Sequence, residues 1–285
     1  MNVADQIVQT TVRIETQGLK DSGSGTGFFF RFCSSDASNV PVIVTNKHVI
    51  EDVSTGQFYI NLKNKNANEP DIGKHISVSV ADFEKNWVKH PDRDVDLAVF
   101  PIAPVLQRLN QQGHEPFYIG FDTEFLADPT FMSELSAIED IIMIGYPIGL
   151  WDARHNLPVV RRGVTATPPY VDFDGKPQFM IDCACFPGSS GSPVLLFNSG
   201  GYVDKAGTIR IGGTRVKLLG VLCAGPHFTA QGEIRAVPVP TSVKSVALSQ
   251  IPINLGYCVK ADQLRWFEAH FQKLIDAEKA VAASV

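Results

Sequence analysis

Residues 185–194 combine serines with glycine and proline in an order that suits nucleophilic chemistry, and they read CFPGSSGSPV. A serine hydroxyl is a weak nucleophile, so an enzyme that uses one needs a neighbouring base and backbone N–H groups directed at the oxygen that becomes negative. Gly188 has no side chain to shield its N–H group, and Gly191 lets another backbone approach closely. The segment predicts an acyl-transfer site at Ser190, although a Ser/Gly-rich turn has the same composition.

Two further segments supply the partners that such a serine needs. Residues 42–50 read VIVTNKHVI, an apolar strand followed by a polar turn and His48. Histidine is the general base whose unperturbed pKa lies near working pH. Residues 93–100 read RDVDLAVF, where Asp96 precedes an apolar strand and could orient an imidazole. Each residue taken singly has a structural explanation, and Asp94 is a rival carboxylate because the period of two places it on the same strand face.

The order of these residues along the chain separates families of serine hydrolases. The chain runs His48, Asp96, Ser190. The α/β-hydrolases run Ser, Asp, His around a G-x-S-x-G elbow, and here Ser192 stands where the last glycine is required. Subtilisins begin with the aspartate, which also does not fit.

The segments together resemble the trypsin-like peptidases, and among them the bacterial HtrA/Deg branch. Residues 23–28 (GSGTGF) are similar to the first glycine-rich strand of that branch, residues 45–49 (TNKHV) to its histidine motif and residues 96–99 (DLAV) to its aspartate motif. Residues 144–149 (IGYPIG) are similar to its G-x-P-x-G turn, and residues 181–191 (IDCACFPGSSG) match its nucleophile strand without a gap.

The resemblance implies a role for each matching residue. Ser190 becomes the nucleophile, His48 the acid-base and Asp96 the orienting carboxylate, with Asp94 as the alternative. The oxyanion hole is expected in the segment Gly188, Ser189, Ser190, from the N–H groups of its first and last residues. The reaction implied is hydrolysis of peptide bonds through an acyl-enzyme.

The resemblance also locates the substrate-binding residues. The residue six positions before the nucleophile, Ala184, lies at the floor of the primary specificity pocket of such enzymes, and residues 220–225 (GVLCAG) form the strand that pairs with substrate. No carboxylate stands at the floor to bind Lys or Arg, so we expect cleavage after small or medium apolar residues. The substrate-binding residues predicted are Ala184, Cys185, Cys223, Ala224 and Gly225.

The elements that must position these residues are short strands. Apolar runs rich in β-branched residues, bounded by turn residues, occur at 10–15, 27–32, 40–45, 57–62 and 95–102, and again at 141–145, 159–166, 178–182, 193–197, 216–222 and 256–259. We expect an all-β, chymotrypsin-like fold of two six-stranded antiparallel β-barrels with a C-terminal α-helix. The single peptidase domain divides into an N-terminal barrel at 10–103, a connection at 104–137, a C-terminal barrel at 138–259 and the helix at 260–282. Segments 64–74 and 152–157 are expected to be surface loops.

The composition indicates which partners and which cellular location to expect. The 25 Lys and Arg are outnumbered by 30 Asp and Glu, and no basic run could neutralise a phosphate backbone, so nucleic acid is not an expected partner. No run is long and apolar enough to cross a membrane. Five cysteines, odd in number and mostly within apolar runs, indicate free thiols and a cytoplasmic location. No metal or cofactor is expected; the expected partners are a protein or peptide substrate and either a regulatory protein or further copies of the chain.

Two other functions are compatible with these residues. The first is a catalytically silent or autoinhibited two-barrel domain that serves as a binding or sensor module. The second is an esterase or transferase that uses the same residues on a small substrate.

Overall fold

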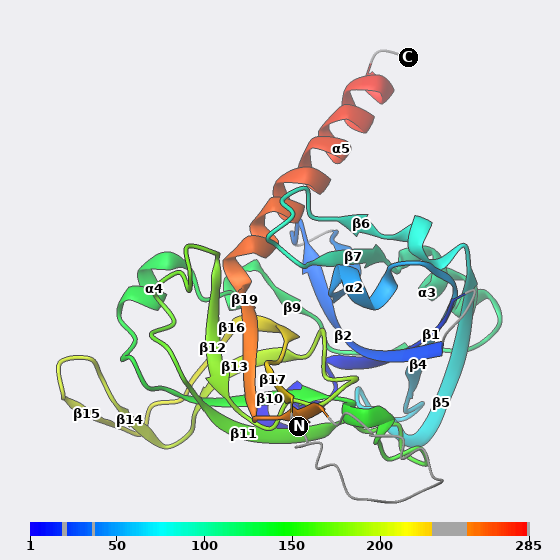
Figure 1. Ribbon diagram of the computed structural model, residues 1–285. Coiled ribbons are helices and arrows are strands. Elements are labelled where there is room, and N and C mark those ends of the chain that lie inside the picture. Colours follow the sequence, from blue (N-terminus) through cyan, green and yellow to red (C-terminus); the bar gives the residue numbers. More distant parts are fainter. Residues whose placement is uncertain (19–21, 36–37, 230–249, 284–285) are drawn as a thin grey trace, which may run out of the picture.

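The computed structural model describes residues 1–18, 22–35, 38–229 and 250–283. Two β-sheets, one from each half of the chain, lie side by side, and a long helix leaves the second sheet and extends beyond both (Figure 1). The mainly β architecture and the C-terminal helix are as predicted.

The first half forms an open sheet with the strand order β5-β4-β1-β2-β3-β7-β6. Within the described residues no pairing joins β5 to β6, so the prediction of a second closed barrel is wrong for this half. The reason is that β6 is only two residues long and the turn η1 precedes it. Its elements are α1 (Val3–Val8), β1 (Thr11–Gly18), β2 (Ser22–Phe32), β3 (Val40–Thr45), α2 (Lys47–Ile50), β4 (Val53–Lys63), β5 (Pro70–Ala81), η1 (Phe83–Asn86), β6 (Val88–Lys89) and β7 (Ala98–Pro101).

Aromatic side chains fill the side of the sheet that backbone pairing leaves open. The Phe83 ring lies 5.5 Å from both the Phe58 and the Trp87 rings, and Phe58 lies 5.2 Å from Phe100. All four side chains are buried. The sheet therefore wraps around an apolar core of its own although its hydrogen-bonded edge stays open.

The second half forms a closed six-stranded barrel, as predicted. The strand order is β10-β11-β12-β19-β16-β13, and β13 pairs back onto β10. The strands are β10 (Asp140–Gly145), β11 (Val159–Thr165), β12 (Gln178–Asp182), β13 (Pro193–Asn198), β16 (Arg215–Ala224) and β19 (Leu255–Lys260). Two small two-stranded sheets pair β14 (Gly201–Val203) with β15 (Ile209–Ile211) and β17 (His227–Thr229) with β18 (Gln250–Pro252).

The segment between the halves has more structure than the sequence indicated. Its β8 pairs with β4, and its β9 pairs in parallel with β2, so it extends the first sheet. The expected loop at 64–74 is also partly wrong, because β5 begins at Pro70. The elements are α3 (Ala103–Gln111), β8 (Pro116–Phe117), β9 (Phe121–Asp122), η2 (Thr123–Phe125) and α4 (Pro129–Ser133), and η3 (Pro147–Gly149) follows β10.

One apolar cluster joins the two halves. Phe28, Phe30 and Phe32 of β2 pack in it with barrel residues such as Leu195 and Val259. The helix begins with the turn η4 (Ala261–Leu264) and continues as α5 (Arg265–Ala283). No helix of the described residues is long and apolar enough to span a bilayer.

Phe267 anchors α5 to this cluster, and its replacement should show how much that packing stabilises the fold. Its fully buried ring lies 6.1 Å from Phe32 and 5.7 Å from His90. We expect Phe267→Ala to lower the free energy of unfolding by about 3–5 kcal/mol in urea titrations. Leu274→Ala, on the exposed part of the same helix, should change it by less than about 0.5 kcal/mol. Equal effects of the two substitutions would contradict the assignment.

Candidate active site

His48 and Asp96 meet at the end of β3. The strand ends at Thr45, Asn46 precedes α2, and His48 lies in the first turn of that helix. The His48 Nδ1 atom is 2.6 Å from Asp96 Oδ2, and the His48 backbone N–H donates to Asp96 Oδ1 at 3.3 Å. The Asn46 side chain donates to the Asp96 carbonyl at 2.7 Å, which fixes the backbone that carries the carboxylate.

The rival carboxylate points elsewhere. Asp94 pairs with Lys176, with 2.8 Å between Nζ and Oδ1, and both side chains are about half exposed. The period of two did not apply, because residues 94–97 precede β7 and are not in a strand. Of the two aspartates, Asp96 is the one in contact with His48.

Ser190 follows a tight turn that contains Gly188. The turn is closed by the Ser189 N–H, which donates to the Phe186 carbonyl at 3.0 Å, and Gly188 has φ +87°. Among the described residues, the N–H groups of Gly188 and Ser190 have no acceptor. These two groups are free to bind an anionic oxygen, whereas the Ser189 N–H is used inside the turn, so its inclusion in the predicted oxyanion segment is corrected.

Thr26 of β2 connects the Ser190 loop to the first sheet. Its N–H donates to the Ser190 carbonyl at 2.9 Å and its hydroxyl donates to the Gly188 carbonyl at 2.9 Å. The same hydroxyl accepts the Tyr146 N–H at 3.0 Å, and the Thr26 carbonyl accepts the Thr45 hydroxyl at 2.7 Å. Sequence reasoning placed Thr26 in a glycine-rich strand but missed this role, because its partners are far away along the chain.

Backbone groups around the Ser190 loop leave no room for side chains at two glycines. A Cβ atom at Gly191 would lie 1.9 Å from the Thr26 carbonyl oxygen, and one at Gly188 would lie 2.6 Å from the Tyr146 carbonyl oxygen. Both glycines also have φ +87°, where other residues are strained. The glycines of the nucleophile segment are therefore required by packing as well as by chemistry.

The histidine and the serine are brought into one region, but no hydrogen bond joins them within the described residues. From Ser190, backbone and hydroxyl bonds lead through Thr26 to Thr45, three residues before His48. His48 contacts Asp96 through Nδ1, and neither His48 Nε2 nor Ser190 Oγ forms a hydrogen bond to another described residue. Hydrogen bonds of this kind often form or tighten only when substrate is bound.

The turn η3 holds the other side of the Gly188 turn. The Ile148 N–H donates to the Pro187 carbonyl at 2.5 Å. Ile148 has φ +51°, which is rare for a β-branched residue and costs about 1–3 kcal/mol. The IGYPIG motif, identified from the sequence only as a turn, therefore contacts the peptide that carries the Gly188 N–H.

The predicted specificity pocket is only partly as expected. A Cβ atom at Gly225 would lie 3.8 Å from the Cys185 Cβ, so these two residues face one another. The Cys223 thiol instead lies in the core and donates to the Tyr257 carbonyl at 3.2 Å. Burial raises the pKa of Cys185 and of Cys223 to about 12, so both thiols are protonated and unreactive at neutral pH.

One charged residue near this pocket was not anticipated. Arg161 of β11 donates to the Ala184 carbonyl, and its guanidinium lies 4.9 Å from the centre of the Phe186 ring. A separate hollow of about 400 Å³ lies beside Asp96 and Ala224. Within the described ranges no group of three His, Cys, Asp or Glu side chains is arranged to hold a metal ion.

Sequence comparison defines the class of the protein. A family model described as "Trypsin-like peptidase domain" matches residues 25–203, which is more than half of the chain. The chain therefore belongs to the trypsin-like peptidase domain family, as the motifs predicted, and its class is that of the serine endopeptidases. No curated protein matches the sequence significantly.

Solved structures with a similar fold include two bacterial proteases. The active form of the Rv3671c protease from M. tuberculosis is 15% identical, with a TM-score of 0.44, and the match covers 92% of this chain and 80% of that chain. The serine endoprotease from Yersinia pestis is also 15% identical with a TM-score of 0.44, and the match covers 96% of this chain and 64% of that chain.

The Thr26 hydroxyl should be essential for holding the two halves together. Thr26→Val keeps the shape of the side chain but leaves the buried Tyr146 N–H and Gly188 carbonyl without a partner. We expect the free energy of unfolding to fall by at least about 2 kcal/mol in urea titrations. Thr26→Ser retains the hydroxyl and should lose only about 1 kcal/mol. The assignment is wrong if valine is tolerated as well as serine.

Proposed function

We propose that the chain hydrolyses peptide bonds with Ser190 as nucleophile, His48 as acid-base and Asp96 as orienting carboxylate. The supporting observation is the 2.6 Å contact between His48 Nδ1 and Asp96 Oδ2. A carboxylate at Nδ1 favours the tautomer with the proton on that atom, which leaves the lone pair on Nε2. His48 can then accept a proton through Nε2.

The reaction follows from these roles. Ser190 Oγ attacks the carbonyl carbon of the substrate while its proton passes to His48 Nε2, and the substrate oxygen becomes negative. That oxygen accepts the N–H groups of Gly188 and Ser190. His48 then donates the proton to the leaving amine, which gives the acyl-enzyme. A water molecule, deprotonated by His48, attacks the acyl carbon and releases the acid.

The substrate backbone is proposed to pair with a shorter strand segment than the sequence indicated. The pairing of β16 with β13 ends at Val221. Beyond it, the Leu222 N–H donates to the Ser192 carbonyl and the Leu222 carbonyl accepts the Gly191 N–H. Residues 220–222 are therefore already paired on the side of the nucleophile loop. Substrate would add as a β-strand along residues 223–225, beside the hollow that contains Asp96.

Small or medium apolar side chains are proposed to fill the primary pocket. Ala184, Ala224 and Gly225 contribute no charge, and the Cys185 thiol is neutral at working pH. The guanidinium of Arg161 donates to the Ala184 carbonyl and lies over the Phe186 ring. A cation beside the pocket also disfavours a basic substrate side chain.

A cytoplasmic location is proposed as well. All five cysteines are free thiols, and four of them are buried: Cys183, Cys185, Cys223 and Cys258. This is the state in which cysteines are kept in a reducing compartment. Regulation by a partner protein or by self-association is a further proposal from the sequence.

The two aspartates provide a matched test of the proposed triad. Asp96→Asn should lower kcat by about 10⁴-fold on a peptide substrate, because the neutral amide favours the wrong histidine tautomer. Asp94→Asn removes only a half-exposed ion pair and should stay within about twofold of the parent protein. A fluorophosphonate should label the parent protein at Ser190, and Ser190→Ala and His48→Ala should abolish labelling. Labelling that survives in either variant would contradict the roles assigned to Ser190 and His48, whereas a parent protein that is not labelled at all would favour a silent binding domain.

Substrate preference can be measured with a peptide library and mass spectrometry of the products. We expect cleavage after Ala, Val and residues of similar size, because no carboxylate lies at Ala184. Ala184→Asp should shift the preference toward Lys and Arg. A profile of the parent protein dominated by basic residues would refute the proposed pocket, and turnover of esters without any peptide cleavage would indicate an esterase.

A further inference from the structure

We propose that Arg13 is a positioning residue for the oxyanion hole and that it acts through the turn η3. The inference rests on the proposed function, since it concerns the Gly188 N–H group. Arg13 lies on β1 in the first sheet, whereas η3 and the Gly188 turn belong to the second half of the chain. Nothing in the sequence pattern around Arg13 indicates this connection.

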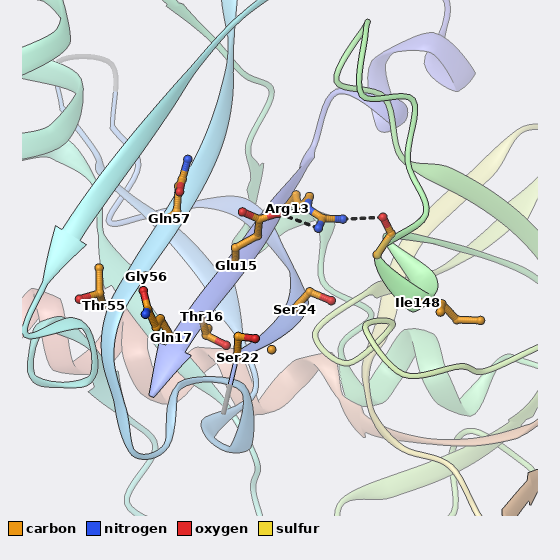
Figure 2. Close-up of a pocket in the computed structure, with 12 residues that line it drawn as sticks. Arg13, Glu15, Thr16, Gln17, Ser22, Ser24, Thr55, Gly56, Gln57 and Ile148 are labelled. Carbon is orange, nitrogen blue, oxygen red and sulfur yellow. Dashed lines mark hydrogen bonds and ion pairs between the residues drawn. The ribbon is translucent and has the colours of Figure 1, made fainter. Parts of the chain in front are cut away.

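Arg13 is buried, and each of its three guanidinium nitrogens donates a hydrogen bond. The Nη1 atom donates to the Gly149 carbonyl at 2.7 Å, while Nε and Nη2 donate to Glu15 Oε1 at 3.0 and 2.7 Å (Figure 2). Its guanidinium carbon lies 4.9 Å from the centre of the Trp151 ring. A planar guanidinium held on two edges and one face has little freedom to move, so the position of the Gly149 carbonyl is well defined.

The partners of Arg13 are themselves fixed. Tyr59 of β4 donates its hydroxyl to Glu15 Oε2 at 2.7 Å, so both carboxylate oxygens of Glu15 are used. The Tyr59 ring also contacts Trp151, with 4.9 Å between ring centres. Arg13 and Tyr59 thus dock η3 and the following Trp151 on the first sheet, and Arg13 is the one that bonds the turn directly.

The turn η3 in turn fixes the orientation of the peptide group that carries the Gly188 N–H. Ile148, next to Gly149, donates its N–H to the Pro187 carbonyl at 2.5 Å. The Pro187 carbonyl and the Gly188 N–H belong to one planar trans peptide group and point in opposite directions. When Ile148 holds the carbonyl on one side, the Gly188 N–H must face the other side. A peptide rotated by half a turn would replace that donor with a carbonyl oxygen.

Apolar packing holds η3 at Pro147, which is buried, but not at its centre. Ile148 has φ +51° and is 61% exposed, so the centre of the turn combines an unfavourable backbone conformation with few apolar contacts. One side of it faces a hollow of about 540 Å³, which Arg13, Glu15, Ile148 and Gly149 help to line. The charge-assisted bond from Arg13 is therefore the contact best placed to keep the turn in this conformation.

The role of Arg13 is tested by measuring turnover of two Arg13 variants, with a substitution of another arginine, Arg215, as the control. Arg13→Met keeps the volume but loses every donor, and we expect kcat on a peptide ester to fall about 10- to 100-fold with KM changed less than about threefold, because the donor acts on the transition state. Binding of a peptide aldehyde, whose adduct has a negative oxygen, should weaken by the same factor. Arg13→Lys can keep one bond and should be intermediate. Arg215→Met removes an equally buried pair with Glu139 in the barrel and should leave kcat within about twofold.

A structural readout separates this proposal from the proposed function. In crystal structures of the parent protein and of Arg13→Met, we expect the Pro187 carbonyl to leave the Ile148 N–H in the variant only. If the parent protein fails to react with fluorophosphonate but this change is seen, the proposed function fails and the positioning role stands. If the peptide keeps its orientation in Arg13→Met, or if kcat falls only in proportion to the folded fraction measured by circular dichroism, the positioning role is refuted.

Discussion

The structure depends on the buried contact between Thr26 and the Ser190 loop. Thr26 is fully buried and makes four hydrogen bonds, which reach the loop, β10 and β3. Burying a polar group without a hydrogen-bond partner costs free energy. Loss of any one of these four bonds would therefore destabilise the interface between the halves. A single residue thereby sets the distance between the sheet that carries His48 and the barrel that carries Ser190. The glycine at 191 follows from the same contact, since a Cβ there would collide with the Thr26 carbonyl oxygen.

The Ser190 loop is thus positioned mainly through its backbone carbonyls. Thr26 bonds to the carbonyls of Gly188 and Ser190, and Ile148 bonds to that of Pro187. Three carbonyls of the Ser190 loop are therefore oriented by residues outside it. Preorganised N–H groups stabilise a developing charge without reorganisation during the reaction. A hydrophobic core alone would not provide this, because apolar contacts are not directional.

The two halves reach their stability in different ways. The second half closes its sheet, so each strand pairs on both sides. The first half leaves its sheet open, and the rings of Phe58, Phe83 and Trp87 fill the gap. Phe32 on β2 then packs against Phe267 of α5, so the terminal helix contributes to the core between the halves rather than only covering the barrel.

The sequence by itself determined the mainly β class and the strands of the barrel, because strand periodicity and turn residues are local patterns, and its motifs predicted the site residues through their resemblance to the trypsin-like peptidases. It missed β5, where Ile76, Val78 and Val80 alternate with serines but form no continuous apolar run. The tertiary structure added that Asp96, which the motif already favoured over Asp94, contacts His48, that the Ser189 N–H closes a turn, and that Thr26 joins the two halves. These outcomes depend on hydrogen bonds between residues far apart along the chain, whose direction no local pattern encodes.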